Sequence, residues 1–226
     1  MKHLKVASLY TTPQSSIAYE WLQLFEYPWE ALSQISDWIL KTGEQLPKEE
    51  YERIGEDVWI SKRATVSPSA SVSGPCIICE GSEIRHCAFI RGSALIGKNA
   101  VVGNSTELKN CILFDNVQVP HYNYVGDSIL GFRSHMGAGA VTSNVKSDKT
   151  PVTIRCGSEI IPTNRKKFGA MLGDFVEIGC NSVLNPGTVI GVNSNVYPRS
   201  CVRGYVPDNS IFKAQDNIVK KQFEKN

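Results

Sequence analysis

The chain has 226 residues, 42% of them hydrophobic, which is enough for one sizeable core and favours one or two domains. Its 24 basic and 22 acidic residues nearly balance, so the basic surface of a nucleic-acid or membrane-surface binder is not expected. No stretch approaches the roughly 18 consecutive apolar residues of a membrane-spanning helix. The first residues also lack the apolar run of a signal peptide, so a cytoplasmic location is the default expectation.

Residues 1–56 do not repeat and are expected to form a small helical domain. In residues 15–25 and 29–41 apolar side chains recur at helical spacing, and Pro28 between them suits a helix start. We expect two or three helices that cap the first coil of the fold that follows, because the bare end of a repeat fold exposes its core and strand edges. A substrate-binding lid or an oligomer contact is the alternative interpretation.

The next part of the chain follows a six-residue repeat. A period of six matches neither a helix nor a simple strand, but it matches a chain that turns a corner every six residues. Three such hexads make one triangular coil, with aliphatic side chains stacked inside and small side chains at the corners. The predicted fold class is therefore an all-β solenoid of hexapeptide repeats, spanning residues 57–210. The repeating aliphatic residues are Ile60, Val66, Val72, Ile78, Ile84, Ile90, Ile96, Val102 and Leu108.

Two slips interrupt this repeat. The step from Leu108 to Leu113 is five residues long, and so is the step from Val125 to Leu130. One-residue slips resemble bulges or shortened corners, which redirect side chains and often lie beside functional sites. The slips therefore direct attention to the residues between and around them.

The repeat then stops over residues 145–171, which carry many charges, including Arg165, Lys166 and Lys167. We expect a loop extruded from one corner of the solenoid, because loops of this length in compact domains are usually functional or disordered. The three basic residues would suit the phosphates of a coenzyme or a salt link between subunits. After the repeat resumes, residues 211–226 are predicted to form a short closing helix.

Cys76 and Cys79 have the CxxC spacing of redox and zinc sites. Cys76 occupies a small-residue corner, whereas Cys79 follows the inward-facing Ile78, so the two thiols should point in different directions. We expect structural thiols. A metal or redox pair is the alternative, although the sequence has no second CxxC to complete a four-ligand zinc site.

Three residues form the first candidate for chemistry. His121 lies between the two slips, among polar and aromatic neighbours, and histidine is the side chain best suited to accept a proton near neutral pH. Arg91 and Lys109 each follow an inward residue and lie one full coil apart, so they should stack on the same side of the solenoid. A stacked Arg and Lys pair suits a phosphate group, and solvated surface charges are the alternative.

The stretch PHYNYVGDS at residues 120–128, followed by MGAGAVTSN at 136–144, identifies a family resemblance. It is similar to the acetyltransferase domain of the bifunctional glucosamine-1-phosphate acetyltransferase and N-acetylglucosamine-1-phosphate uridyltransferase. It resembles more closely the archaeal sugar-phosphate nucleotidyltransferase/acetyltransferase branch, which shares a long charged loop ending in a segment like KKFGA. The resemblance covers residues 58–206 and implies a left-handed parallel β-helix.

The resemblance also implies site residues. His121 matches the base that takes a proton from the sugar amine, and Arg91 and Lys109 match residues that hold the sugar phosphate. Tyr124 matches a phosphate- or sugar-binding tyrosine, and Asn144 matches an asparagine that contacts the amino sugar.

For the acetyl-CoA side, Gly137, Ala138 and Gly139 match a backbone segment near the acetyl group, whose N–H groups would stabilise the oxyanion. Cys180 is also expected to be a cofactor-binding residue. Its place in the regular repeat argues against a role as a nucleophile.

Some residues depart from the family pattern. His135 stands where the family has an asparagine, so it is a candidate substrate-binding residue with altered recognition. The Asn-Tyr-Asp-Gly turn of the bacterial enzymes is absent after Asn144, and Lys149 is a loose match to a family lysine. Residues 1–56 contain no glycine-rich nucleotide loop and are too few for a Rossmann-like domain, so uridylyl transfer by this chain alone is not expected.

The sequence therefore predicts an acetyl-CoA-dependent N-acetyltransferase acting on an amino-sugar 1-phosphate, without a metal. The resemblance implies a homotrimer with sites between subunits, and a separate nucleotidyltransferase is a possible partner. Two alternatives stay open. One is a non-catalytic solenoid that senses sugar nucleotides or scaffolds a nucleotidyltransferase. The other is a γ-carbonic-anhydrase-like metalloenzyme with His86, His121 and His135 as ligands.

Overall fold

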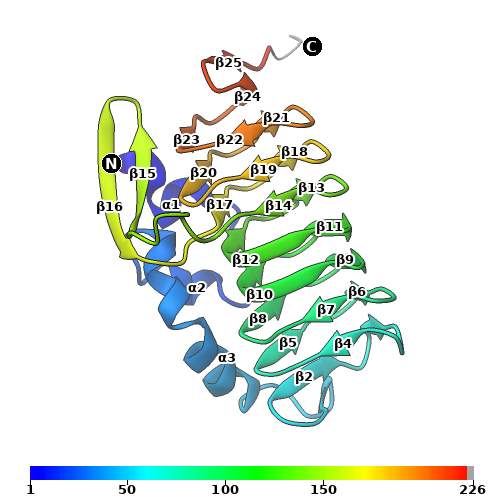
Figure 1. The fold of residues 1–226 in the computed structure, drawn as a ribbon. Coiled ribbons are helices and arrows are strands. Elements are labelled where there is room, and N and C mark those ends of the chain that lie inside the picture. Colours follow the sequence, from blue (N-terminus) through cyan, green and yellow to red (C-terminus); the bar gives the residue numbers. More distant parts are fainter. Residues whose placement is uncertain (223–226) are drawn as a thin grey trace.

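The computed structural model describes residues 1–222, and the repeat region winds into a left-handed parallel β-helix of about nine turns (Figure 1). The predicted fold class is confirmed. Each coil contributes short strands to three faces, which we number in the order in which the chain meets them. Strands of successive coils pair in parallel along each face.

The strands of the first face are β2 (Val58–Ser61), β5 (Cys76–Ile78), β8 (Ala94–Ile96), β17 (Ala170–Leu172), β20 (Thr188–Ile190) and β23 (Tyr205–Val206). Those of the second face are β3 (Thr65–Val66), β6 (Glu83–Ile84), β9 (Val101–Asn104), β11 (Gln118–His121), β13 (His135–Met136), β18 (Glu177–Ile178), β21 (Asn195–Val196) and β24 (Ser210–Ala214). Those of the third face are β4 (Ser71–Val72), β7 (Phe89–Ile90), β14 (Val141–Thr142), β19 (Val183–Leu184) and β22 (Cys201–Val202).

Two longer strands, β10 (Glu107–Leu113) and β12 (Tyr124–Leu130), run from the third face onto the first without a break. The first part of β10 pairs with β7 of the third face, and its last part pairs with β8 of the first face. These continuous strands account for the two slips of the repeat, because each one crosses a corner with one residue fewer.

The first face has an apolar outer surface as well as an apolar inner one. The middle residues of its strands are in register from coil to coil and are almost completely buried. This outer ladder consists of Trp59, Ile77, Leu95, Ile112, Ile129, Met171 and Val189. A second layer must therefore cover the first face, since a row of exposed aliphatic side chains would be unfavourable in water.

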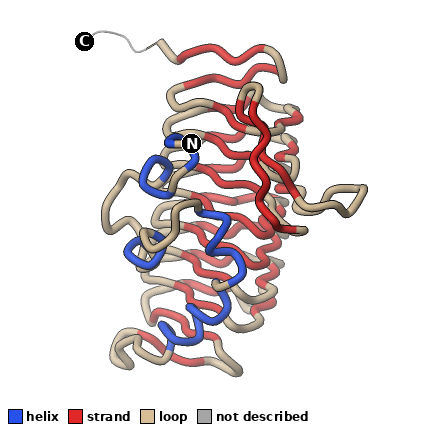
Figure 2. Tube along the Cα trace, turned by 90° about the vertical axis from the view of Figure 1, so that its left-hand side faces the viewer, coloured by secondary structure: helices blue, strands red, loops and turns tan. Residues whose placement is uncertain are grey.

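The covering layer is the N-terminal segment, residues 1–45, which we call the strap. Figure 2 shows it lying across the strands of the first face, and it runs from the last coils toward the first. His3 stacks on Tyr205 near one end, and α3 contacts β5, β8 and β10 near the other. Its helices are η1 (Lys2–Leu4), α1 (Val6–Leu9), α2 (Tyr19–Leu22), η2 (Pro28–Ser33) and α3 (Ile35–Gly43).

The expected helices are thus present, but the expected position at the end of the solenoid is wrong. The strap covers a side because the outer ladder offers it a continuous apolar surface. The Asp174 carboxylate holds it in place by accepting the backbone N–H groups of Thr11 and Thr12, each at 2.8 Å. Tyr10 is buried there and stacks on Phe114 at 4.9 Å.

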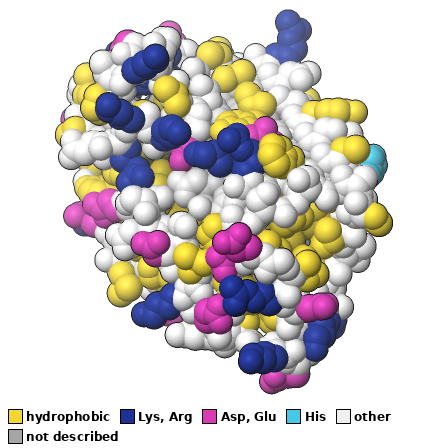
Figure 3. All heavy atoms as spheres, turned by 60° about the horizontal axis from the view of Figure 1, so that its bottom comes forward, with side chains coloured by type: hydrophobic (Ala, Val, Ile, Leu, Met, Phe, Trp, Pro, Cys, Tyr) yellow, Lys and Arg dark blue, Asp and Glu magenta, His cyan; other side chains and the backbone are white. Residues whose placement is uncertain are grey.

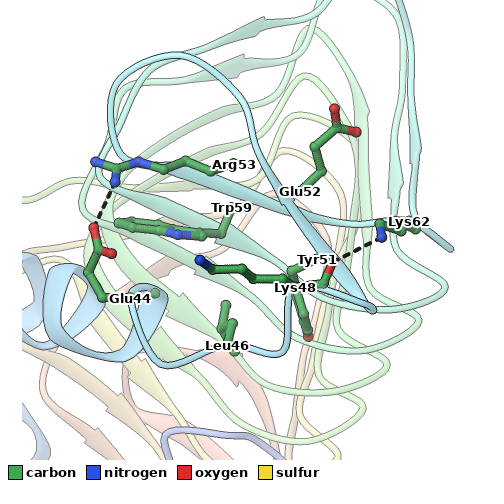
Figure 4. Close-up of a pocket in the computed structure, with 9 residues that line it drawn as sticks. Glu44, Leu46, Lys48, Tyr51, Glu52, Arg53, Trp59 and Lys62 are labelled. Atoms are coloured by element: carbon green, nitrogen blue, oxygen red, sulfur yellow. Dashed lines mark hydrogen bonds and ion pairs between the residues drawn. The ribbon is translucent and has the colours of Figure 1, made fainter.

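The end of the first coil is closed by β1 (Tyr51–Arg53), which pairs antiparallel with β2. Here the Arg53 guanidinium lies 5.2 Å from the Trp59 ring centroid and forms a 2.8 Å ion pair with Glu44 (Figure 4). Basic and acidic side chains intermingle on this end of the molecule (Figure 3). The strand edge is covered by pairing and by charge, so no helix over the end is required.

The prediction of a closing helix from residue 211 is wrong for the described part of the tail. Residues 210–220 form an antiparallel hairpin of β24 and β25 (Asn217–Lys220), and residues 223–226 lie outside the described range. Ile211 and Phe212 pair with β21, so they continue the second face for one more coil.

The charged segment 145–171 leaves the solenoid as predicted, but it is not a loop throughout. It contains an antiparallel hairpin of β15 (Val152–Cys156) and β16 (Glu159–Arg165), and the solenoid resumes at Ala170. Among residues 1–222, no helix is long and apolar enough to cross a membrane.

Candidate functional site

The corner between the third and first faces carries most of the predicted substrate-binding residues. Lys109 and Asn110 turn this corner in β10, and Gly126 and Asp127 turn it in β12, one coil further on. Asn110 and Asp127 have φ angles of 50° and 49°, in the left-handed region that Asn and Asp tolerate better than most residues. Arg91, Lys109, Asn110, Asp127 and Asn144 form what we call the polar corner.

A buried carboxylate lies at the centre of the polar corner. Asp127 is only 3% exposed, and it accepts hydrogen bonds from Asn144 at 2.6 Å and from Asn110 at 2.8 Å. The Lys109 ammonium group lies 3.5 Å from the same carboxylate. Asn144 Nδ2 also lies 3.2 Å from the Tyr124 hydroxyl. Buried charges are tolerated when they are paired and hydrogen-bonded, so this network fixes Lys109, Tyr124 and Asn144 relative to one another.

Arg91 lies one coil before Lys109, as the spacing predicts, and its backbone N–H donates to the carbonyl of Leu108. Its guanidinium is exposed and forms a 2.7 Å ion pair with Glu107. The hydrogen bond to Glu107 and the charge of Glu107 raise the pKa of Arg91. Glu107 was not among the residues expected at the site, although its position two residues before Lys109 on the same strand was a usable signal.

Tyr124 lies one coil after Glu107, because the two residues pair between neighbouring strands of the third face. Burial raises the pKa of the Tyr124 phenol, and the negative charges of Asp127 and Glu107 add to this effect. The phenol therefore stays protonated over the whole physiological range and is available as a hydrogen-bond donor.

The strap and the extruded hairpin both reach the polar corner. Asn110 donates a second hydrogen bond to the carbonyl of Leu32 in the strap, at 3.1 Å. At the base of the hairpin, the N–H groups of Phe168 and Gly169 donate to the carbonyls of Asn144 and Asp127. Sequence reasoning missed the contribution of the strap, because no local pattern links Leu32 to a residue in the repeat.

His121 lies at the next corner, between the second and third faces, at the end of β11. Its side chain is exposed, while its backbone is fixed on both sides. The His121 N–H donates to Asn123 Oδ1 at 3.1 Å, and the His121 carbonyl accepts the N–H of Gly139 at 3.0 Å. An exposed imidazole on a rigid backbone is available for proton transfer.

Asn123 connects this corner to the segment predicted to bind the cofactor. It is 2% exposed and donates to the carbonyls of Gly137 and Ala140, at 2.9 and 3.0 Å. The carbonyl of Ala138 in turn accepts the N–H of Asn181 in the following coil. His121, the segment Gly137–Gly139 and Cys180 therefore follow one another along one corner, which we call the histidine corner.

The two glycines of this segment have structural reasons to be glycine. A Cβ at Gly137 would lie 2.8 Å from the backbone N of Cys180, so the next coil leaves it no room. Gly139 has a φ of +71°, in the left-handed region. Their N–H groups already donate to the carbonyls of Ile178 and His121, so neither glycine has an N–H free to donate to an oxyanion.

His135 is not brought to either corner. It lies on the outer surface of the second face, where its Nδ1 is 2.8 Å from Glu177 Oε2. His86 and His121 lie at one corner, connected through Asn104, which pairs with His121 and donates to the carbonyl of His86. No group of three or more side chains placed to hold a metal ion occurs within residues 1–222.

The CxxC cysteines are both buried and free. Burial raises the pKa of the Cys79 thiol to about 12, and that of Cys76 is also raised. Thiols with pKa values this far above neutrality remain protonated and unreactive, which agrees with a structural role.

The hollow drawn in Figure 4 lies at the first coil, away from both corners, and Leu46, Lys48 and Tyr51 help to line it. Lys62, at its rim, donates to the carbonyl of Lys48. The charged groups of this hollow thus serve to close the end of the solenoid.

The fold and its corners define a hexapeptide-repeat β-helix protein. A model of the family described as GMPPB C-terminal domain matches residues 72–190, just over half of the chain, and the chain belongs to this family.

Among similar proteins is the bifunctional protein GlmU of Methanococcus maripaludis. It is 31% identical over 199 residues, which cover 87% of this chain and 48% of that protein. The bifunctional sugar-1-phosphate nucleotidylyltransferase/acetyltransferase of Sulfurisphaera tokodaii is 29% identical over 69% of this chain and 43% of that protein. The expected resemblance to the archaeal bifunctional branch is confirmed, and the chain spans about half the length of these relatives.

Among solved structures, the acetyltransferase domain of PglB from Neisseria gonorrhoeae is 17% identical. The match covers 73% of this chain and 58% of that chain, with a TM-score of 0.34, which is too low to support any inference.

Proposed function

We propose that this chain is an acetyl-CoA-dependent N-acetyltransferase whose acceptor is an amino-sugar 1-phosphate such as glucosamine-1-phosphate. The main support is the buried network around Asp127, which holds Lys109, Tyr124 and Asn144, and Tyr124 follows the exposed His121 by three residues along the chain. The names of the archaeal relatives, which pair a sugar-1-phosphate activity with an acetyltransferase, support the same class.

In this proposal the polar corner binds the acceptor. The Lys109 ammonium and the Arg91 guanidinium attract the phosphate, since both are cations stacked one coil apart. Tyr124 and Asn144 present a hydroxyl and an amide on the same side, and such groups orient the hydroxyls of a sugar. Asp127 does not contact the substrate but positions the groups that do.

His121 acts as the general base. The amine nitrogen forms a bond to the acetyl carbon of the thioester while the imidazole takes the proton that the nitrogen loses. The carbon–sulfur bond then breaks, and the thiolate receives a proton to leave as free coenzyme A. No covalent intermediate on the protein is needed. His135 lies outside this arrangement and takes no part in it.

The acyl donor is assigned to the histidine corner. Exposed Cys180 and Asn181 follow the Gly137–Gly139 segment there. An extended thioester lying along the solenoid axis would meet Cys180, the glycine segment and His121 in that order. The oxyanion needs a donor other than the N–H groups of Gly137 and Gly139, because those are already bonded. We also propose that the chain forms a homotrimer with active sites between subunits. A separate nucleotidyltransferase is its proposed partner.

The test is release of free thiol from acetyl-CoA in the presence of a panel of amines that includes glucosamine-1-phosphate and galactosamine-1-phosphate. We expect turnover with at least one phosphorylated amino sugar. If none supports thiol release while one or more still bind, the chain is the non-catalytic sensor or scaffold instead.

A further inference from the structure

Arg165 is brought to the polar corner by the extruded hairpin. It is the last residue of β16 and pairs with Val152 across the hairpin. Three residues later the chain is anchored on the solenoid, where Phe168 is fully buried and stacks on Trp29 of the strap at 5.8 Å. The base of the hairpin is therefore held on two sides, and the position of Arg165 is fixed by the fold.

The guanidinium of Arg165 is only partly satisfied. One terminal nitrogen, Nη1, lies 3.3 Å from the hydroxyl of Ser33 in the strap. Its Nε is buried and has no hydrogen-bond partner among residues 1–222. A buried donor without a partner is unfavourable, so this group would gain a hydrogen bond from an acceptor that a ligand supplies.

The charge around Arg165 is also unbalanced. Burial lowers the pKa of Arg165, and the nearby charge of Asp127 acts in the opposite direction. Yet no carboxylate of the described chain lies within ion-pair distance of Arg165, whereas Arg91 is paired with Glu107 and Lys109 with Asp127. Arg165 is thus the cation of this corner that still lacks an anion.

We propose that Arg165 is a further acceptor-binding residue that holds the phosphate of the sugar phosphate, with Ser33 of the strap as its positioning residue. The inference deepens the proposed function and depends on it for the identity of the sugar. A guanidinium fork with a free Nε suits the bidentate geometry of a phosphate. The strap and the hairpin are then parts of the substrate site, and covering the first face is only one of the strap's roles.

Direct binding tests this without catalysis. Calorimetric titration of the whole chain with glucosamine-1-phosphate and with glucosamine separates the phosphate contribution from that of the sugar. For Arg165→Gln we expect at least about tenfold weaker binding of the phosphorylated sugar, equivalent to about 1.4 kcal/mol, and little change for glucosamine. Arg133→Gln is the matched control, since Arg133 is an exposed arginine beside Phe132 at a different corner, and it should bind both as the wild type does.

Three results would overturn the inference. One is unchanged phosphate-sugar binding by Arg165→Gln at an unchanged melting temperature. Another is equal weakening toward both sugars, which would show a structural role. The third comes from a parallel titration with acetyl-CoA: a loss of binding confined to acetyl-CoA would assign Arg165 to the coenzyme.

Ser33→Ala separates positioning from folding. We expect a smaller loss, about two- to fivefold, again only for the phosphorylated sugar. If the wild type binds the phosphorylated sugar but releases no thiol, the acetyltransferase proposal fails while the role of Arg165 stands. If the wild type binds neither sugar, the acetyltransferase proposal and the role of Arg165 both fail.

Discussion

Asp127 determines the shape of the polar corner, because three side chains direct hydrogen-bond donors at its buried carboxylate. Asp127→Asn would turn an amide N–H₂ toward one of those donors and leave Lys109 without its counter-ion. We expect a loss of about 3 kcal/mol in the free energy of unfolding, measured by urea denaturation. The exposed Asp216→Asn serves as the control, and a loss below about 0.5 kcal/mol would contradict the structural role given to Asp127.

His121 is the residue on which the chemistry depends. His121→Ala removes the proposed base without disturbing the backbone bonds that fix its corner. We expect acetyl transfer to fall by about 10²- to 10⁴-fold at an unchanged melting temperature. His86→Ala is a useful partner variant, since His86 lies two coils away at the same corner and should keep full activity. Similar rates in wild type and His121→Ala would remove the base from the mechanism.

At the residue scale, the sequence predicted the contacts that the six-residue period determines. It did not predict the contacts between the repeat and the strap. The stacking of Arg91 and Lys109 follows from a spacing of one coil, so it could be read directly. The role of Asn110 could not, because its second partner is the carbonyl of Leu32, far away in the sequence. His135 was expected at the site on family grounds alone, and its own position on the second face directs it to Glu177 instead.

Among the elements, the strap differs most from expectation. The signal for its true position was present: Ile77, Leu95, Ile112 and Ile129 are apolar, outward-facing and spaced by about one coil. Only the inward-facing residues were considered when the repeat was interpreted, so this second, outward-facing apolar period was missed. The prediction of a closing helix was wrong because a short apolar run in a charged tail fits a strand as well as a helix.

Asp174 fastens the strap to the solenoid and provides its test. Its fully buried carboxylate accepts the N–H groups of Thr11 and Thr12 on one oxygen and that of Phe132 on the other. Asp174→Ala leaves these donors without partners, so we expect amide hydrogen exchange to accelerate over residues 1–45. Asp174→Asn keeps one acceptor oxygen, so its exchange rate over residues 1–45 should lie between those of the wild type and Asp174→Ala. Unchanged exchange in the alanine variant would show that the outer ladder alone retains the strap.

Across the whole molecule, stability depends on contacts between coils and between the coils and the strap, and Asp115 joins both. Its carboxylate accepts the N–H of Lys98 at 2.7 Å, and its backbone N–H donates to Ser15 of the strap. Its carbonyl accepts the N–H of Arg133 in the next coil. The side chain and backbone of this one residue therefore connect three successive coils and the strap.

Burial raises the pKa of Asp115 from 3.8 to about 6, against the opposing hydrogen bond and charge of Lys98. Between these two values the folded chain binds more protons than the unfolded chain, so the free energy of unfolding falls as the pH rises through this window. Because the side chain is partly exposed, solvent screening limits the loss to about 1–2 kcal/mol.

Asp115→Asn keeps an acceptor for Lys98 and cannot ionise. We therefore expect the wild type to lose this amount relative to Asp115→Asn between pH 4 and pH 7 in parallel urea titrations. Parallel pH profiles for the two proteins would show that burial does not penalise the ionised carboxylate.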